Sequence, residues 1–196
     1  MASQIEIANR ALTKLGEARI TTLDEDSKAA ETLSSMYDIV LDSELRANVW
    51  HFAKARALLP ALSADPAFGY GQEFQLPADF LRLIQVGQFR AYPATRDTRG
   101  LFSIEGRALF TDLPAPLALR YIRRVTDATQ YDSLFVEVLA CRLAWECALP
   151  LTQTSTVKQA AMQEYQLAVR AAIRANAVER PSQAIADDTW MEAHRG

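Results

Sequence analysis

Residue types and motifs that would announce a chemical function are scarce in this sequence. Its 196 residues include only two cysteines and two histidines. Cys141 and Cys147 are six positions apart in a predicted helix, point to different faces and cannot form a local disulfide. No His/Cys/acid cluster has metal-ligand spacing, and the common Gly-rich nucleotide motifs and the serine hydrolase elbow are absent. We therefore expect no metal, no cofactor and no catalytic group.

Long apolar runs are also missing. No stretch reaches the roughly 18–20 uncharged apolar residues of a membrane span, and the first ten residues lack the basic region and apolar core of a signal peptide. A composition of 49% hydrophobic and 23% charged residues excludes a disordered or fibrous protein. We expect one compact unit, with or without an appendage, made in the cytoplasm and without a membrane anchor.

The charge is unevenly distributed. The net charge of −3 argues against a dedicated nucleic-acid binder. Between Arg82 and Arg124, however, eight arginines, no lysine and three acids give a local charge of +5, which leaves −8 on the rest of the chain. One interpretation is that this segment faces an acidic partner or phosphate. The other, which we favour, is that the arginines are scattered over the solvent faces of strands.

Two helices are predicted at the start of the chain. Ser3 and Glu6 form a capping box, and Gly16 is a natural C-cap for the first helix. The second helix, about 27–48, rests on the strongest periodic pattern of the sequence, which comprises Leu33, Met36, Tyr37, Val40, Leu41 and Leu45. Three acids at 24–26 precede it. A carboxylate site for sugar hydrolysis or a cation is one explanation, but their favourable position at a helix N-terminus explains them better.

The middle third predicts a small, mostly antiparallel sheet. Residues 50–59 alternate like a strand, 60–72 form a Pro- and Gly-containing loop, and 81–89 are rich in large apolar residues. Residues 102–110 predict a tight hairpin turning at Gly106, and 117–122 a half-buried strand. Trp50 and Phe52 flank His51 either as an aromatic platform or, more in keeping with their place between helix and sheet, as a core anchor.

Two more helices and a tail complete the pattern. Asp132 caps a helix that runs to Pro150, and a fourth helix at about 156–178 has a small-residue stripe formed by Val157, Ala160, Ala161, Leu167, Ala168, Ala171 and Ala172. Beyond Pro181 only three apolar anchors remain. We predict an α+β fold in which 1–49 and 131–180 form a mainly α-helical antiparallel bundle, 50–130 an inserted β-rich segment, and 181–196 an extended C-terminal arm.

Motifs along nearly the whole chain resemble one family. They are Ala8-Asn9, Leu15-Gly16, Ala30, Tyr37, Trp50-His51-Phe52-Ala53, Leu76-Pro77-Ala78-Asp79, Leu81-Arg82, Glu105-Gly106-Arg107, Leu119-Arg120-Tyr121-Ile122, the stretch 135–149 and a late Trp190. In order and spacing they resemble the tail tubular protein A, or head-to-tail adaptor (connector), family of short-tailed bacteriophages. Three residues depart from this pattern. Cysteine is frequent in the family at the positions of Leu33 and Phe80, and tyrosine is frequent at the position of Phe74.

The resemblance implies a structural virion protein at the head-tail junction. It implies a subunit of a homo-oligomeric ring, a dodecamer, between the portal protein and the tail nozzle protein, which extends the DNA channel and helps to retain and eject the viral genome. DNA would pass through without sequence-specific binding, and no catalytic motif carries over.

The residues themselves suggest which parts form the interface. We expect Ile185, Trp190 and Met191 to dock the arm on a neighbouring subunit or the portal, because the tail cannot bury them by itself. Arg123 and Arg124 would dock on an acidic protein surface, because arginine forks suit carboxylates.

Two other classes stay open at this point. A glycan or peptidoglycan hydrolase associated with a phage tail would need a buried acid with a raised pKa in a cleft. A regulatory DNA-binding protein would need a basic recognition helix, and the fourth helix, with Lys158, Arg170 and Arg174 widely spread, is a poor candidate.

Overall fold

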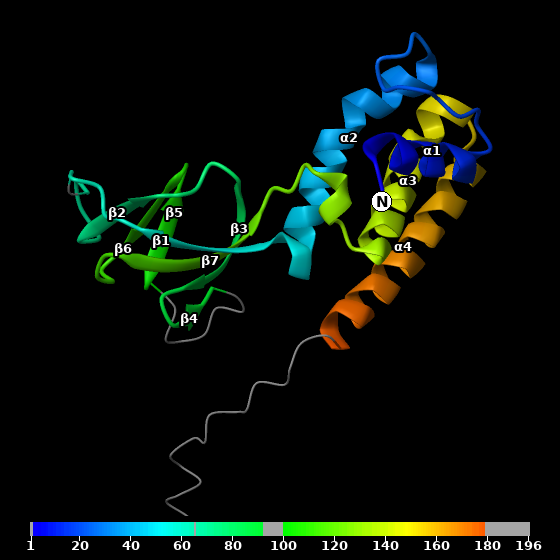
Figure 1. Cartoon of the computed structure of the whole chain (residues 1–196). Helices are drawn as coiled ribbons and strands as arrows, with labels where there is room; N and C mark the ends of the chain where they lie inside the picture. Colours follow the sequence, from blue (N-terminus) through cyan, green and yellow to red (C-terminus); the bar gives the residue numbers. More distant parts are fainter. Residues whose placement is uncertain (1, 65, 92–99, 179–196) are drawn as a thin grey trace, which may run out of the picture.

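Helices gather on one side of the molecule and strands on the other (Figure 1). The computed structural model describes residues 2–64, 66–91 and 100–178, so the predicted arm at 181–196 lies outside the described residues. In the described part, α1 (Gln4–Leu15), α2 (Lys28–Ala47), α3 (Ser133–Thr152) and α4 (Ser155–Val178) are the long helices. The predicted α+β class is confirmed.

The first two helices begin and end close to their predicted bounds. Both hydrogen bonds of the capping box join Ser3 and Glu6, and Gly16 ends α1 with a φ of 74°, which a residue without a Cβ adopts at little cost. Ser27 Oγ accepts from Ala30 N–H at the start of α2. The loop between them is held by Asn9, whose buried amide donates to and accepts from the backbone of Ile20.

The β part consists of two small antiparallel sheets where the sequence predicted one. Their orders are β1-β7-β3-β4 and β2-β6-β5. The strands are β1 (Lys54–Leu59), β2 (Gln72–Gln75), β3 (Phe80–Val86), β4 (Phe89–Arg90), β5 (Phe102–Glu105), β6 (Ala108–Thr111) and β7 (Leu117–Arg123). The sheets pack on each other through a shared apolar core that includes Phe74, Leu109, Leu83 and Leu119. The predicted hairpin, with Gly106 at a φ of 60°, is confirmed as β5 and β6.

Two predicted bounds are wrong. The strand expected from residue 50 starts at Lys54, because His51–Ala53 forms a 3₁₀ turn in which Trp50 leaves the strand pattern for the helical core. The helix expected to stop at Pro150 continues to Thr152. Proline there occupies the last turn, where the ring removes one helical hydrogen bond and the helix ends soon after at Gln153.

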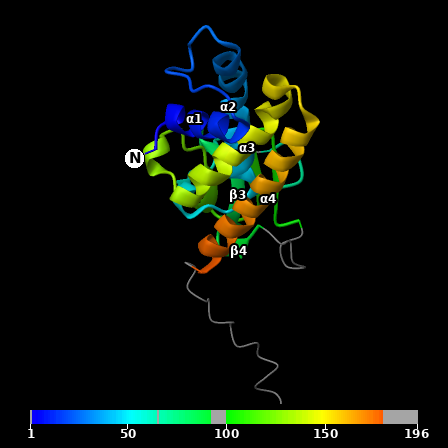
Figure 2. The ribbon, with the colours of Figure 1, turned by 90° about the vertical axis from the view of Figure 1, so that its right-hand side faces the viewer.

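The larger core surrounds α3, which lies among α1, α2 and α4 (Figure 2). Trp50 is only 2% exposed, and its indole N–H donates to the backbone oxygen of Glu44 at 2.9 Å. Its ring meets that of Phe135 edge-on, with 5.0 Å between centroids, and Phe52 lies 4.9 Å from the same ring. The interpretation of Trp50 and Phe52 as core anchors is therefore confirmed.

The predicted stripe on α4 is only half correct. Val157, Ala161, Ala168 and Ala172 pack toward the core, whereas Ala160, Leu167 and Ala171 are exposed. The seven residues span more of the helix circumference than one neighbouring helix covers, and α3 is the main neighbour of α4. In the described part of the chain, no helix combines the length and apolarity needed to cross a bilayer.

The packing of α4 is testable at two adjacent alanines. Ala161 is 7% exposed, so Ala161→Leu inserts three extra carbons at a buried position and should lower the free energy of unfolding by about 1–3 kcal/mol. Ala160→Leu, on the exposed side, should change it by less than about 0.5 kcal/mol. Urea denaturation followed by circular dichroism measures both; equal losses in the two variants would contradict this orientation of α4.

Candidate functional site

The two arginines predicted to form an interface lie where β7 leaves the sheet. Arg124 Nε donates to Asp42 Oδ1 at 2.6 Å, and its Nη2 lies 3.3 Å from Asp38 Oδ1. The hydrogen bond with Asp42 raises the pKa of Arg124. Arg123 Nη2 instead donates to the uncharged Gln130 at 2.7 Å. Arg124 therefore joins β7 to α2 within its own chain, and the interface role of both residues stays a prediction.

Other arginines of the same segment also bind inside the molecule. Arg82 Nη1 donates to the carbonyls of Arg46 and Ala47 at 3.1 and 3.0 Å, where the end of α2 leaves carbonyls without helical partners. Arg46 donates in turn to the carbonyl of Leu81, and Arg107 to that of Pro77. These arginines border a hollow of about 400 Å³ between α2 and the sheets. Arg82 and Arg46 thus hold the end of α2 against β3, whereas the bond of Arg107 lies within the β part.

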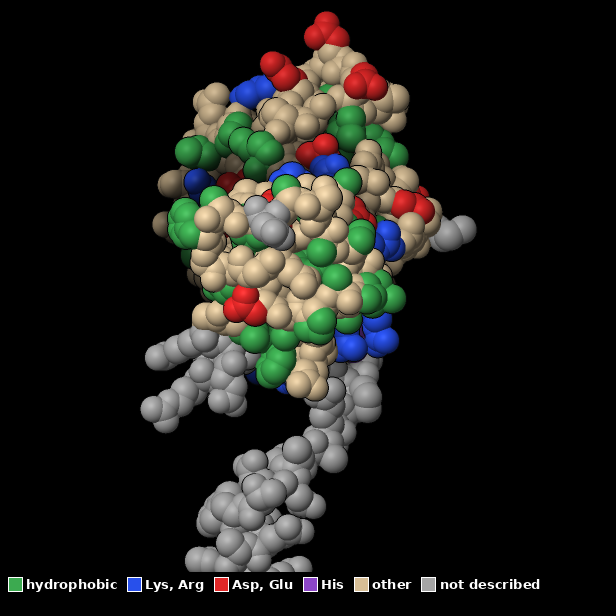
Figure 3. Space-filling view, turned by 90° about the vertical axis from the view of Figure 1, so that its left-hand side faces the viewer, with side chains coloured by type: hydrophobic (Ala, Val, Ile, Leu, Met, Phe, Trp, Pro, Cys, Tyr) green, Lys and Arg blue, Asp and Glu red, His purple; other side chains and the backbone are tan. Residues whose placement is uncertain are grey.

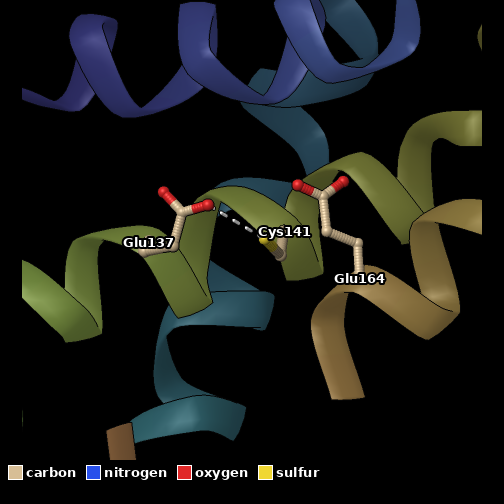
Figure 4. A group of neighbouring side chains, drawn as sticks. All are labelled: Glu137, Cys141 and Glu164. Carbon is tan, nitrogen blue, oxygen red and sulfur yellow. Dashed lines mark hydrogen bonds between the residues drawn. The ribbon is translucent and has the colours of Figure 1, made fainter. Parts of the chain in front are cut away.

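Among the described residues, one group of potential metal ligands comes together (Figure 4). Ligand atoms of Glu137, Cys141 and Glu164 all lie within 4.8 Å of one another. The ammonium group of Lys14, on α1, already contacts both carboxylates, at 2.8 Å for Glu137 Oε1 and more closely for Glu164 Oε1, and Arg10 pairs with Glu137 as well. We name Lys14, Glu137 and Glu164 the three-helix ionic cluster, since they come from α1, α3 and α4.

The pKa shifts of Lys14 and Glu137 agree with permanent charges on these two residues. Burial alone would lower the pKa of Lys14, but its hydrogen bonds with the two carboxylates raise it overall. Burial alone would raise the pKa of Glu137, and the hydrogen bond and charge of Lys14 hold it below its usual value. Burial raises the pKa of the Cys141 thiol to about 11, which keeps it protonated at neutral pH. The lysine thus supplies the positive charge that a cation would bring.

Sequence reasoning missed this cluster because its members come from distant parts of the chain. Glu137 and Cys141 are four residues apart and share a helix face, which was the only local signal. Nothing local points to Lys14 or Glu164.

A second group of polar side chains centres on Glu44 of α2, which is only 2% exposed. Tyr165 donates its hydroxyl to Glu44 Oε1 at 2.8 Å, and Arg142 Nε lies 4.0 Å from the same oxygen. Arg142 pairs with Glu146 at 2.6 Å and lies over the Trp145 ring, with 4.2 Å to its centroid. Burial raises the pKa of Glu44 more than the tyrosine hydrogen bond and the arginine charge lower it.

Glu44 is the kind of acid that the hydrolase alternative requires, because it is buried and its pKa is raised. It lines neither the hollow beside Arg107 nor one of about 250 Å³ between Trp50, Tyr131 and Asn176. Its described neighbours are the side chains that cross from α2 to α3 and α4. This arrangement suits a structural network that sets how the helices face each other, and it gives the hydrolase alternative no support.

Comparison with known proteins adds no assignment. The sequence matches no protein-family model, and no curated protein is significantly similar to it.

The Glu44 network has a testable pH dependence. The pKa of Glu44 is higher in the folded than in the unfolded chain, so the contribution of this carboxyl to stability is present in acid and is lost as the pH rises through its folded pKa. Glu44→Gln keeps an acceptor for Tyr165 and removes the charge. As the pH rises from 5 to 8, the free energy of unfolding of this variant should therefore increase relative to that of the wild type, as measured by urea denaturation.

The matched control is Glu31→Gln, which removes an exposed charge from the first turn of the same helix, where a carboxylate is favourable, and should therefore show no such gain. A Glu44→Gln variant that loses stability relative to the wild type as the pH rises would show that the charged carboxylate is favourable where it lies.

Proposed function

We propose that this chain is a structural virion protein, a subunit of the ring-forming adaptor between the portal and the tail nozzle of a short-tailed phage. The ring would extend the DNA channel and help to retain and eject the genome. The observation that carries the proposal is the ordered set of motifs, from Ala8-Asn9 to Trp190, that resembles this family. The protein would act in the tail after assembly in the host cytoplasm, without catalysis.

The positions of the resembling residues support the proposal. Ala8, Tyr37 and Trp50 are buried around α3, and Leu119 and Tyr121 are buried between the sheets. Others shape turns and joints, among them Asn9 and Gly16 in the first loop and Asp79, which accepts the hydroxyl of Tyr121 at 3.0 Å. A shared fold needs residues of these kinds at these places, because they fix the core and the chain reversals.

The division of the molecule also suits an adaptor. The bundle contains helices from both ends of the described chain, and the β part projects from it (Figure 1). A subunit with two such parts offers separate surfaces to a component above and a component below, and head-to-tail contacts between copies close a ring when the rotation per subunit divides a full turn. The net charge of −3 would limit sticking of DNA in the channel.

The test is electron microscopy of the purified protein, alone and mixed with the portal ring of the phage that encodes it. We expect twelve-fold rings stacked on the portal, with or without rings in the protein alone. A protein that remains monomeric in mass photometry even with the portal present would overturn the adaptor proposal.

Charge reversal at the two adjacent arginines separates assembly from folding. Arg123→Glu breaks no ion pair seen in the described chain and should leave stability within about 0.5 kcal/mol of the wild type, while it weakens assembly on the portal by about tenfold. Arg124→Glu places a third carboxylate beside Asp38 and Asp42 and should cost about 1–2 kcal/mol of folding free energy. Thermal melts measure stability, and co-sedimentation with the portal measures assembly. Normal assembly of Arg123→Glu would remove that residue from the interface.

A further inference from the structure

The outward face of the four-stranded sheet is covered by the bundle at one end and open at the other. Near the bundle, Ile122 of β7 and Leu81 and Ile84 of β3 belong to the helical core. Farther along, the same strands border a hollow of about 310 Å³. Its lining residues are Arg56, Ala57, Leu58, Gln85, Gly87, Ala118, Leu119 and Arg120. Figure 3 looks at the β end of the molecule, where hydrophobic side chains are exposed across the surface.

Two like charges face each other in this hollow. Arg56 of β1 and Arg120 of β7 are direct partners in the antiparallel register, so their Cβ atoms are about 4.5–5.5 Å apart. Neither guanidinium has an ion pair or hydrogen bond with a described residue, and none of the lining residues is acidic. Like charges in this relation destabilise a sheet. A carboxylate bound between the two guanidinium groups would replace their repulsion by attraction.

The hollow also has an apolar side. Leu58 is paired with Ala118 next to the two arginines, and 69% of its side chain is exposed. A ligand that fits both sides carries acids and large apolar groups close together. We name Arg56, Leu58, Ala118 and Arg120 the arginine-leucine face.

The chain itself contains a segment of this composition. Residues 185–192 read Ile-Ala-Asp-Asp-Thr-Trp-Met-Glu, with three acids, three large apolar side chains and no basic residue. The segment follows the end of α4 at Val178, and the twelve residues from there to Trp190 span at most about 40 Å when extended. That length reaches well beyond the end of the helix that carries it.

We infer that the arginine-leucine face is the docking site for residues 185–192 of this chain. Asp187 and Asp188 pair with Arg56 and Arg120, and Trp190 or Met191 covers Leu58. This inference rests on the proposed adaptor function and on the docking role that the sequence predicts for the arm, and it names the surface that receives the arm. It also implies that the acidic partner of the arginine-rich segment binds Arg120 rather than Arg124. Arg124 already forms ion pairs with Asp38 and Asp42.

The other hollow near the end of α4 fits this segment less well. It has aromatic walls in Trp50, Phe52 and Tyr131, but Asp132 is one of its lining residues and no lysine or arginine is. An acidic segment would meet repulsion there and no compensating charge.

Disulfide trapping in the full-length protein tests the inference. Leu58→Cys is combined with Met191→Cys and oxidised under mild conditions. The native cysteines stay out of the reaction, because Cys141 and Cys147 are buried and burial raises their thiol pKa values to about 11 and about 12. The matched control is Ile39→Cys with Met191→Cys, since Ile39 is 67% exposed but lies on α2 beside Asp38. We expect the disulfide at position 58 to form at least about tenfold faster than at position 39.

Charge variants then identify the cause. Arg56→Glu with Arg120→Glu should reduce trapping at position 58 to the control rate, and adding Asp187→Lys with Asp188→Lys should restore it. A non-reducing gel shows whether the same copy or a neighbouring copy supplies the segment. Equal trapping at positions 58 and 39, or a rate that charge reversal does not change, would overturn the docking site. If trapping fails while the unmodified protein forms rings on the portal, the docking site is wrong and the adaptor function stands.

Discussion

The enclosure of α3 is the constraint on which the rest of the structure depends. Apolar residues occur around its whole circumference, and nine of its twenty residues are buried, from Phe135 to Ala148. A helix of this kind is stable only when other elements cover it on most sides. The neighbouring α4 covers one side, and α1 and α2 cover the others. The two ends of the described chain must therefore meet, and the strands are left as an insertion between them.

The β part is joined to the bundle through β3 and β7, which each contribute side chains to both cores. Tyr121 of β7 packs between the two sheets, whereas the next residue, Ile122, packs against the helices. Side chains on a strand alternate between its faces, so adjacent positions of β7 serve two cores. The register shifts in this part of the sheet lie on the β3 side of the pairing, between Phe80 and Arg82 and between Leu83 and Gln85. The ion pairs of Arg124 with α2 and the hydrogen bond from Tyr121 to Asp79 hold the strand in this position.

Local signals in the sequence predicted most of the elements and little of what connects them. The capping box, Gly16, Asp132 and the hairpin at Gly106 all act within a few residues, so helices and turns could be placed from the sequence. The split into two sheets could not, because strand order depends on pairings such as β1 with β7 that are about sixty residues apart.

The candidate sites divide in the same way. The sequence identified an unusual density of arginines, but only the structure shows that Arg82 and Arg124 are used inside the chain while Arg56, outside the arginine-rich segment, stands opposite Arg120. It also could not place Lys14 between Glu137 and Glu164, or Glu44 beside Tyr165, because these contacts cross more than a hundred positions.

The contact between helices from the two ends of the described chain has a consequence for synthesis on the ribosome. α1 and α2 carry apolar faces whose covering helix begins only at Ser133, about 86 residues after the end of α2. At a synthesis rate of roughly 5–20 residues per second, those faces stay uncovered for about 4–17 s before α3 begins to be made. During that time the strands emerge from the ribosome, and they can pair locally only with one another. The α3–α4 hairpin forms later, from adjacent segments, and packs against α1 and α2 after these two helices have left the ribosome. Until then, a chaperone would have to shield the apolar faces of α1 and α2.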